Sequence, residues 1–208
     1  MIKVKAYPVT MIETNCCYIV DEATGEAAVT DPGGRSEELI KQIKKDGCKL
    51  RYVLLTHGHY DHICYAAQLA KQFSAQIITG RANSEFLKNG ELNRTSAHNI
   101  PFEPFEADIL LDDGDTFMLG ETEFTYLSTP GHTSGCGVFL ADGVMFAGDT
   151  LFCGSCGRTD LPTGDDVQIM SSFKKLKELD GDYTVIPGHG PMTTLERERR
   201  FNPYMRML

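Results

Sequence analysis

Four side chains of types that commonly bind metals lie within the six-residue stretch HGHYDH: His57, His59, Asp61 and His62. The apolar stretch LRYVLLT, residues 50–56, precedes them and predicts a strand buried on both faces. Histidines two residues apart point the same way from extended backbone, whereas Asp61 and His62 fall where the chain turns into a helix. Three crowded imidazoles repel one another when protonated, and burying them neutral costs desolvation energy unless a metal takes their lone pairs. The stretch therefore predicts a metal site.

Three further candidate ligands each follow an apolar strand: His132 in STPGHTSG, Asp149 in VMFAGDT and His189 in IPGHGP. Ends of strands at one edge of a sheet converge, and loops held there by a rigid scaffold are where sites are built. Five histidines and two aspartates exceed what a single zinc needs, which is three side chains and a water. We therefore predict a two-metal centre with one carboxylate available as a bridge. The remaining histidine, His98, lies in a stretch without a pattern and is predicted to be structural.

Predicted strands and helices alternate along the chain, and several strands are paired as hairpins. The predicted strands are residues 2–9, 15–20, 50–56, 75–80 and 183–187, a third strand that stops at the turn 32–34, and two hairpins that turn at 120–121 and 142–143. The predicted helices are residues 37–47 with Ser36 as N-cap, 66–73, 81–90, 164–179 and 193–200, and residues 89–108 are predicted to be a surface loop. This order predicts one α/β domain over residues 1–208, with layers built on one or two mixed sheets.

Composition narrows the function classes. The net charge of −9 argues against nucleic-acid binding, because that needs Lys and Arg to displace counterions from phosphates. No apolar run is long enough to span a bilayer and no segment resembles a signal peptide, so we expect a cytoplasmic protein without membrane contact that acts on a small molecule. Seven cysteines without a secretion signal predict reduced thiols. The CGSC stretch, Cys153 to Cys156, is interpreted as structural, although Cys156 could touch a substrate thiol.

The motifs HGHYDH, PGHTSG, GDT and PGHG, in this order, resemble the signature of the metallo-β-lactamase superfamily. The resemblance implies a four-layer αββα sandwich with the site at the edge where the two sheets meet. It also implies that one metal is bound by His57, His59 and His132 and the other by Asp61, His62 and His189. Asp149 would bridge the two. One departure is ICYAA, residues 63–67, where many relatives have a pair of small residues, and its larger side chains would change how the helix packs beneath the metals.

The stretch GRTDLPTGD, residues 157–165, resembles that of glyoxalase II-like hydrolases. In this resemblance Arg158 and Asp160 order the loop below the site by ion pairing. The tail TTLERERRFNPYM, residues 193–205, is similar to that of the short members, which lack the long C-terminal helical extension that contacts glutathione. The implied function is a binuclear metal-dependent hydrolase of thioesters such as S-lactoylglutathione. Two divalent ions, zinc in preference to iron or manganese, would hold a hydroxide that attacks the carbonyl, and Asp61 would also orient it.

Two other functions stay open at this point. Persulfide dioxygenases share the fold and are similar in GHTSGC and CGRTD, and in them one iron uses the positions matching His57, His132 and Asp149. Such an enzyme would act on glutathione persulfide. The third alternative is a metal-bound scaffold without activity, which the complete ligand set disfavours. The open cleft left by the missing extension would allow a homodimer to cover it.

Overall fold

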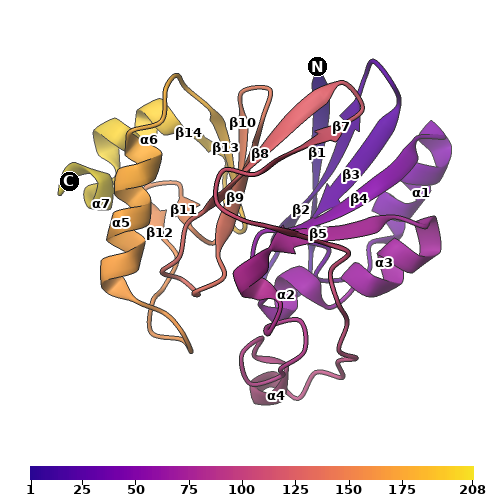
Figure 1. Cartoon of the computed structure of the whole chain (residues 1–208), viewed down its shortest axis with the longest axis horizontal. Helices are drawn as coiled ribbons and strands as arrows, with labels where there is room; N and C mark the ends of the chain where they lie inside the picture. Colours follow the sequence, from indigo (N-terminus) through magenta and orange to yellow (C-terminus); the bar gives the residue numbers. More distant parts are fainter.

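A first mixed sheet is built by the N-terminal half of the chain, as the computed structural model of residues 1–208 shows (Figure 1). Its six strands lie side by side in chain order, and β1 to β3 are antiparallel whereas β3 to β6 are parallel. The strands are β1 (Ile2–Val9), β2 (Thr14–Asp21), β3 (Glu26–Thr30), β4 (Lys49–Leu55), β5 (Gln76–Gly80) and β6 (Ile109–Leu111).

A second mixed sheet has the strand order β14-β13-β10-β9-β8-β7, in which only the pair β10 and β13 is parallel. Its strands are β7 (Thr116–Leu119), β8 (Thr122–Ser128), β9 (Gly137–Ala141), β10 (Val144–Gly148), β13 (Thr184–Pro187) and β14 (Thr193–Thr194). A small hairpin of β11 (Leu151–Phe152) and β12 (Ser155–Cys156) follows β10. The turns at 120–121 and 142–143 connect these strands as the sequence predicts.

Helices cover the outer face of each sheet, so that the molecule has four layers (Figure 1). On the first sheet lie α1 (Glu37–Asp46) and α3 (Ala66–Phe73), and on the second lie α5 (Asp166–Lys177), α6 (Leu195–Phe201) and α7 (Pro203–Arg206). The short α2 (Tyr60–Ile63), the 3-10 turn η1 (Arg81–Asn83) and α4 (Thr95–His98) belong to the connections. The predicted αββα sandwich is confirmed.

Alternation along the strands explains the layers, because successive residues of a strand face opposite sides of its sheet. In β2, Cys16 and Tyr18 belong to the core under α1 and α3, whereas Cys17 and Ile19 belong to the core between the sheets. The second sheet divides in the same way between the central core and a third core under α5 and α6. A strand that is apolar on both faces is thus required wherever two cores meet, which is why 50–56 shows no polar alternation.

Two local predictions have different outcomes. Ser36 does cap α1, since its hydroxyl accepts a hydrogen bond from Leu39 N at 3.2 Å, and Gly47 ends the helix with a positive φ of 66°. The predicted helix 81–90 is wrong beyond its first turn. Asn83 is fully buried, and its Nδ2 donates hydrogen bonds to Thr79 Oγ1 and to the carbonyl of Gly135. Because these tertiary contacts fix the turn, the chain does not continue as a helix.

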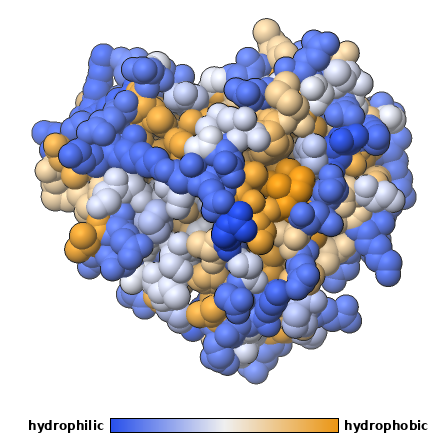
Figure 2. Space-filling view, in the orientation of Figure 1, coloured by the Kyte–Doolittle hydropathy of each residue, from blue (hydrophilic) through white to orange (hydrophobic).

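Hydrophilic residues cover most of the face seen in Figure 2, with small hydrophobic areas among them, the clearest near the centre. None of the helices is both long enough and apolar enough to cross a bilayer.

Candidate metal centre

The seven predicted ligands meet at one end of the sandwich because the strands that carry them end there. His57 and His59 follow β4, and His132 follows β8, while Asp149 and His189 come directly after β10 and β13. Asp61 and His62 lie on α2, the single turn that continues from β4. The side-chain atoms of these seven residues form three overlapping groups, each with ligand atoms within 4.8 Å of one another: His57-His59-His132, His57-His62-Asp149 and Asp61-His62-His189.

The first of these groups is formed by three imidazole nitrogens. His59 Nδ1 lies 3.1 Å from His57 Nε2 and 2.9 Å from His132 Nε2. The other nitrogen of His132, Nδ1, is 2.7 Å from the carbonyl oxygen of Arg158. A carbonyl only accepts, so His132 Nδ1 carries the hydrogen and, in the neutral ring, Nε2 presents a lone pair. The three nitrogens thus converge as acceptors for a cation.

The group Asp61-His62-His189 also has ligand atoms that face one another. Asp61 Oδ2 lies 3.2 Å from His62 Nε2 and 3.1 Å from His189 Nε2. His189 Nδ1 faces the carbonyl oxygen of Ile12 at 3.0 Å, which assigns the hydrogen to Nδ1 and turns the Nε2 lone pair inward. The hydroxyl of Thr14 donates to Asp61 Oδ2 at 3.2 Å and fixes that carboxylate.

Asp149 faces the group His57-His59-His132 and the group Asp61-His62-His189. Its Oδ1 lies 3.4 Å from His62 Nε2, and its Oδ2 lies 3.6 Å from His132 Nε2 and 3.7 Å from His189 Nε2. Asp149 is buried, and its Oδ1 accepts no hydrogen bond in the protein. A buried carboxylate oxygen without a donor fits a cation, since burying a charge without a partner is costly. The donor set of imidazole nitrogens and carboxylate oxygens also fits divalent transition metals.

Burial and charge set the protonation states of these side chains. Burial and the neighbouring imidazoles hold the pKa of His57 well below its usual range, and burial lowers the pKa of His59 to about 3. Both rings are therefore neutral near pH 7 and keep a lone pair for a metal. Burial opposes ionisation of Asp61 and Asp149, but His62 outweighs it and lowers the pKa of both. Burial opposes protonation of His62, but these carboxylates outweigh it and raise its pKa. The two ionised carboxylates thus need positive charge, which a divalent cation can supply.

Glycines let the backbone approach the ligands. A Cβ on Gly188 would lie 2.1 Å from Asp149 Oδ1 and 2.8 Å from His62 Cε1. A Cβ on Gly33 would lie 1.4 Å from the carbonyl oxygen of Asp61. No side chain fits in either place, so both positions require glycine for the centre to have this shape.

Comparison with known proteins agrees with this arrangement. The sequence profile of the metallo-beta-lactamase superfamily matches residues 12–189. The chain belongs to this superfamily. It is 37% identical to the hydroxyacylglutathione hydrolase GloC of Haemophilus influenzae, an alignment that covers 97% of each chain. Metallo-beta-lactamase superfamily members are generally metal-dependent hydrolases, and the candidate centre occupies the motifs that carry the resemblance.

Two solved structures show the same metallo-beta-lactamase fold. The BLEG-1 B3 metallo-beta-lactamase is 32% identical and superposes with a TM-score of 0.91, covering 98% of this chain and 99% of its own. The protein TTHA1623, solved in a di-iron-bound form, is 29% identical with a TM-score of 0.83, covering 96% of this chain and 99% of its own.

Asp31 is a residue of the centre that the sequence analysis missed. It is buried directly after β3, and its carboxylate accepts hydrogen bonds from Thr56 N at 2.8 Å and Thr56 Oγ1 at 2.7 Å. Its Oδ2 also lies 3.1 Å from His62 Nδ1, and Thr56 Oγ1 lies 3.3 Å from His57 Nδ1. Thr56 therefore orients His57 through a hydrogen bond, whereas Asp31 acts on His62 through its nearby negative charge. In the sequence this aspartate precedes Pro-Gly-Gly, a context that suggests only a turn.

The remaining predicted residues lie around the centre. Arg158 and Asp160 form a two-pronged ion pair, both bonds 2.6 Å long, on the exposed side of their loop. The loop reaches the centre through the Arg158 carbonyl rather than through these side chains. Cys156 is partly exposed and lines a separate cavity of about 500 Å³ with Arg158. Cys153 Sγ lies 3.3 Å from Arg197 Nη1. All seven cysteines are free thiols, as predicted.

Proposed function

We propose that this chain is a binuclear metal-dependent hydrolase whose substrates are thioesters. The observation that carries the proposal is the orientation of the imidazoles. His132 and His189 hydrogen-bond backbone carbonyls through Nδ1, and His57 and His62 face Thr56 Oγ1 and Asp31 through the same atom. Their Nε2 atoms all point into one space. So many inward lone pairs beside two ionised carboxylates support two cations rather than one.

In this proposal the first cation is held by His57, His59 and His132, and the second is held by Asp61, His62 and His189. Asp149, whose carboxylate faces imidazoles of both groups, would help to hold both cations. Divalent ions bound there would polarise a carbonyl oxygen and lower the pKa of a water. We propose zinc as the physiological metal, because a site of imidazole and carboxylate ligands suits zinc, and iron or manganese can occupy the same ligands.

Within this proposal Asp61 has a second role, as the residue that orients the attacking water. Its Oδ2 accepts a hydrogen bond from Thr14 Oγ1, which limits the rotation of the carboxylate. A carboxylate held in this way can keep a water in one orientation towards a substrate carbonyl. The likeness to GloC, whose name states hydrolysis of a hydroxyacylglutathione, supports a thioester as the bond that is cleaved.

Metal content is the first test. Elemental analysis of protein purified without added metal or chelator should find about two divalent ions per chain. His132→Ala and His189→Ala should each lose about one ion, whereas His98→Ala, at the one histidine outside the centre, should keep both. Removing the ions with a chelator should lower Tm, because ions that bind only the folded chain stabilise it by about 4 kcal/mol when present at ~1,000 times their Kd.

Activity is the second test. The metal-loaded protein should hydrolyse S-lactoylglutathione or simpler thioesters, and Asp61→Asn should lower kcat more than the metal content. A β-lactam substrate belongs in the same screen, because the similar BLEG-1 structure is named as a β-lactamase. One iron per chain, with oxygen uptake in the presence of glutathione persulfide and no thioester hydrolysis, would refute the proposal and favour a persulfide dioxygenase.

A further inference from the structure

A cavity of about 420 Å³ is lined by Tyr60, the sequence neighbour of Asp61, and by eight other residues, none of which is a candidate metal ligand. Its apolar lining comes from three separate segments: Met11 and Ile12 in the β1–β2 turn, Tyr60 and Cys64 at the two ends of α2, and Ile100 after α4. None of its nine lining residues is Asp, Glu, Lys or Arg. Its size falls in the range of small-molecule pockets, which run from about 300 to 1,000 Å³.

Backbone contacts join this cavity to the ligands. The carbonyl of Ile12 holds His189 Nδ1 at 3.0 Å, and Tyr60 directly precedes Asp61. Gly33, which also lines the cavity, packs against the carbonyl of Asp61 so closely that a Cβ would overlap it. Three lining residues therefore adjoin the candidate ligands Asp61 and His189 through the backbone.

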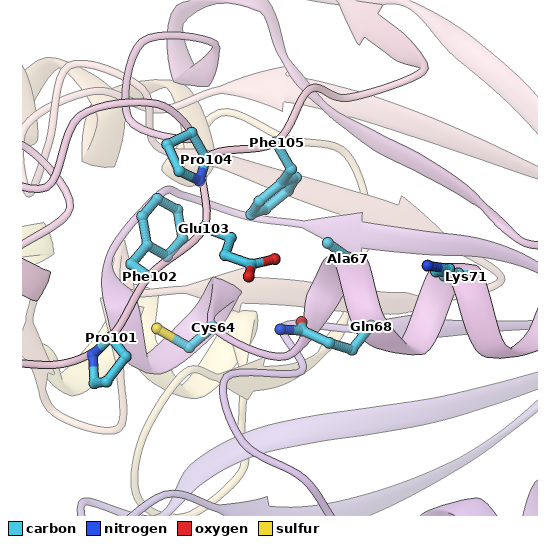
Figure 3. Close-up of a pocket in the computed structure, with 9 residues that line it drawn as sticks. All are labelled: Cys64, Ala67, Gln68, Lys71, Pro101, Phe102, Glu103, Pro104 and Phe105. Atoms are coloured by element: carbon cyan, nitrogen blue, oxygen red, sulfur yellow. The ribbon is translucent and has the colours of Figure 1, made fainter.

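A neighbouring cavity of about 190 Å³ lacks these connections (Figure 3). It shares Cys64 with the first, and Figure 3 shows the thiol pointing towards Pro101 and Phe102. Its lining includes Lys71 and Glu103, and it contains none of the residues that hold a metal ligand. Of the two cavities, only the one without Asp, Glu, Lys or Arg includes residues whose backbone contacts a candidate ligand.

The walls of the uncharged cavity combine rigid and exposed apolar side chains. The Tyr60 ring packs on the His98 ring, with centroids 4.7 Å apart, and Tyr60 N donates to the carbonyl of Asn93 at 2.9 Å. Met11 is fully exposed and Ile12 is about half exposed. Neighbouring apolar side chains left in water beside a polar site are typical of a surface that a ligand covers.

We propose that this cavity binds the acyl part of the substrate and selects acyl groups with an apolar, uncharged body. This inference rests on the proposed thioester hydrolysis and adds the substrate class. An aliphatic or aromatic group would pack between Ile12, Tyr60 and Ile100. A carboxylate or ammonium on the acyl chain would be disfavoured, because no Asp, Glu, Lys or Arg side chain lines the cavity to compensate its desolvation.

The test uses a series of thioesters of one neutral thiol, N-acetylcysteamine, with acetyl, butyryl, hexanoyl, succinyl and benzoyl groups. In the metal-loaded protein, kcat/KM should rise by up to about fourfold for each added methylene until the cavity is filled. Succinyl, which carries a carboxylate, should be hydrolysed at least about tenfold less efficiently than butyryl. Hydrolysis of all members with a profile that is flat within twofold would overturn the acyl pocket alone. No hydrolysis of any member would overturn the proposed function and the pocket with it.

Substitutions in the cavity test whether its residues select the acyl group. Ile100→Asp should lower the hexanoyl-to-acetyl ratio of kcat/KM about tenfold. Ile12→Ser, at a half-exposed side chain where we expect the fold to stay intact, should also lower this ratio. Met118→Asp, at an exposed position on the distant strand β7, should leave the ratio unchanged. Calorimetry with thioethers, in which a methylene replaces the carbonyl, gives a second readout on the metal-free chain. Affinity should increase with alkyl length in the native chain and not in Ile100→Asp, and equal length dependence in both would contradict the assignment.

Discussion

Replacing Asp31 by asparagine should lower the metal affinity of the group Asp61-His62-His189. The metal affinity of the group His57-His59-His132 should change much less. In the native chain Asp31 Oδ1 accepts from Thr56 N, while Oδ2 accepts from Thr56 Oγ1 and faces His62 Nδ1 at 3.1 Å. The asparagine carbonyl can keep the bond to Thr56 N. Its NH₂ group then occupies the place of Oδ2 and turns an N–H towards the Nδ1–H of His62. The nearby negative charge is thereby replaced by an N–H that repels the Nδ1–H, so we expect His62 to rotate or to move its hydrogen to Nε2.

Either response removes the Nε2 lone pair from the group formed by Asp61, His62 and His189. Loss of such an orienting partner typically costs 10- to 100-fold in metal affinity, or about 1.4–2.7 kcal/mol. His57 should be affected much less, because Thr56 Oγ1 still has a lone pair for His57 Nδ1 after it accepts a hydrogen bond from the new amide. We therefore expect one of the two zinc affinities of Asp31→Asn to fall and the other to change by less than about threefold.

Competition with a chromophoric chelator measures both affinities, and Thr56→Val is the matched control. Valine keeps the shape of Thr56 but removes the hydroxyl that faces His57, while the carboxylate of Asp31 still faces His62. Thr56→Val should thus lower the metal affinity of the group that contains His57 and His59, and Asp31→Asn that of the group that contains His62 and His189. His57→Ala and His189→Ala each remove a ligand from one group. The affinity that is lost in each variant shows which measured affinity belongs to which group. Equal weakening of both sites in either variant, or no change in Asp31→Asn, would refute the reasoning.

Three other substitutions test single contacts, one at the candidate centre and two elsewhere in the fold. Gly188→Ala would place a methyl group against Asp149 Oδ1, so metal binding should be lost in elemental analysis while circular dichroism still shows the fold. Glu198 is fully buried and accepts hydrogen bonds from four donors, including Gly154 N at 2.7 Å, so Glu198→Ala should cost about 3–5 kcal/mol in urea unfolding. Hydrogen bonding, chiefly from a threonine hydroxyl, lowers the pKa of Asp21 to about 2, below its unfolded value near 4. The stability that it contributes is present above pH 4 and is lost as the pH falls towards 2, so Asp21→Asn should flatten the stability curve of the metal-free chain in that window.

The ligand positions could be predicted because they are local in the sequence and lie at the ends of apolar strands. HGHYDH follows β4 directly, and Asp149 follows β10, so the periodicity that locates the strands also locates these side chains. The same pattern predicted α/β layers on one or two mixed sheets, since a strand such as β4 must be apolar on both faces to lie between two cores, whereas the four-layer arrangement was implied by the family resemblance. The helix expected at 81–90 failed because Asn83 forms contacts across the fold that no local pattern reports.

The atoms that orient the histidines could not be predicted, because most of them are not side chains of a recognisable type. The carbonyl of Ile12 accepts a hydrogen bond from His189 Nδ1, 177 residues away in the sequence. The carbonyl of Arg158 accepts one from His132 Nδ1. Any residue type provides a carbonyl, so only the fold shows which one is used. Asp31 has an informative side chain, but its partners Thr56 and His62 become neighbours only when β3 and β4 pair.

In the proposed function, metal binding and substrate choice therefore depend on different parts of this fold. The ligands come from strand ends that the two sheets hold in place, and changes there break the centre itself. The proposed acyl pocket comes from the β1–β2 turn, α2 and the segment after α4, and two of these are connections whose apolar side chains no core requires. A substitution at Met11 or Ile100 can change the shape of the cavity without moving a ligand atom, because neither side chain contacts one of the three cores. Relatives with the same seven ligands can consequently differ in substrate, and the loops rather than the motifs are where that difference should be sought.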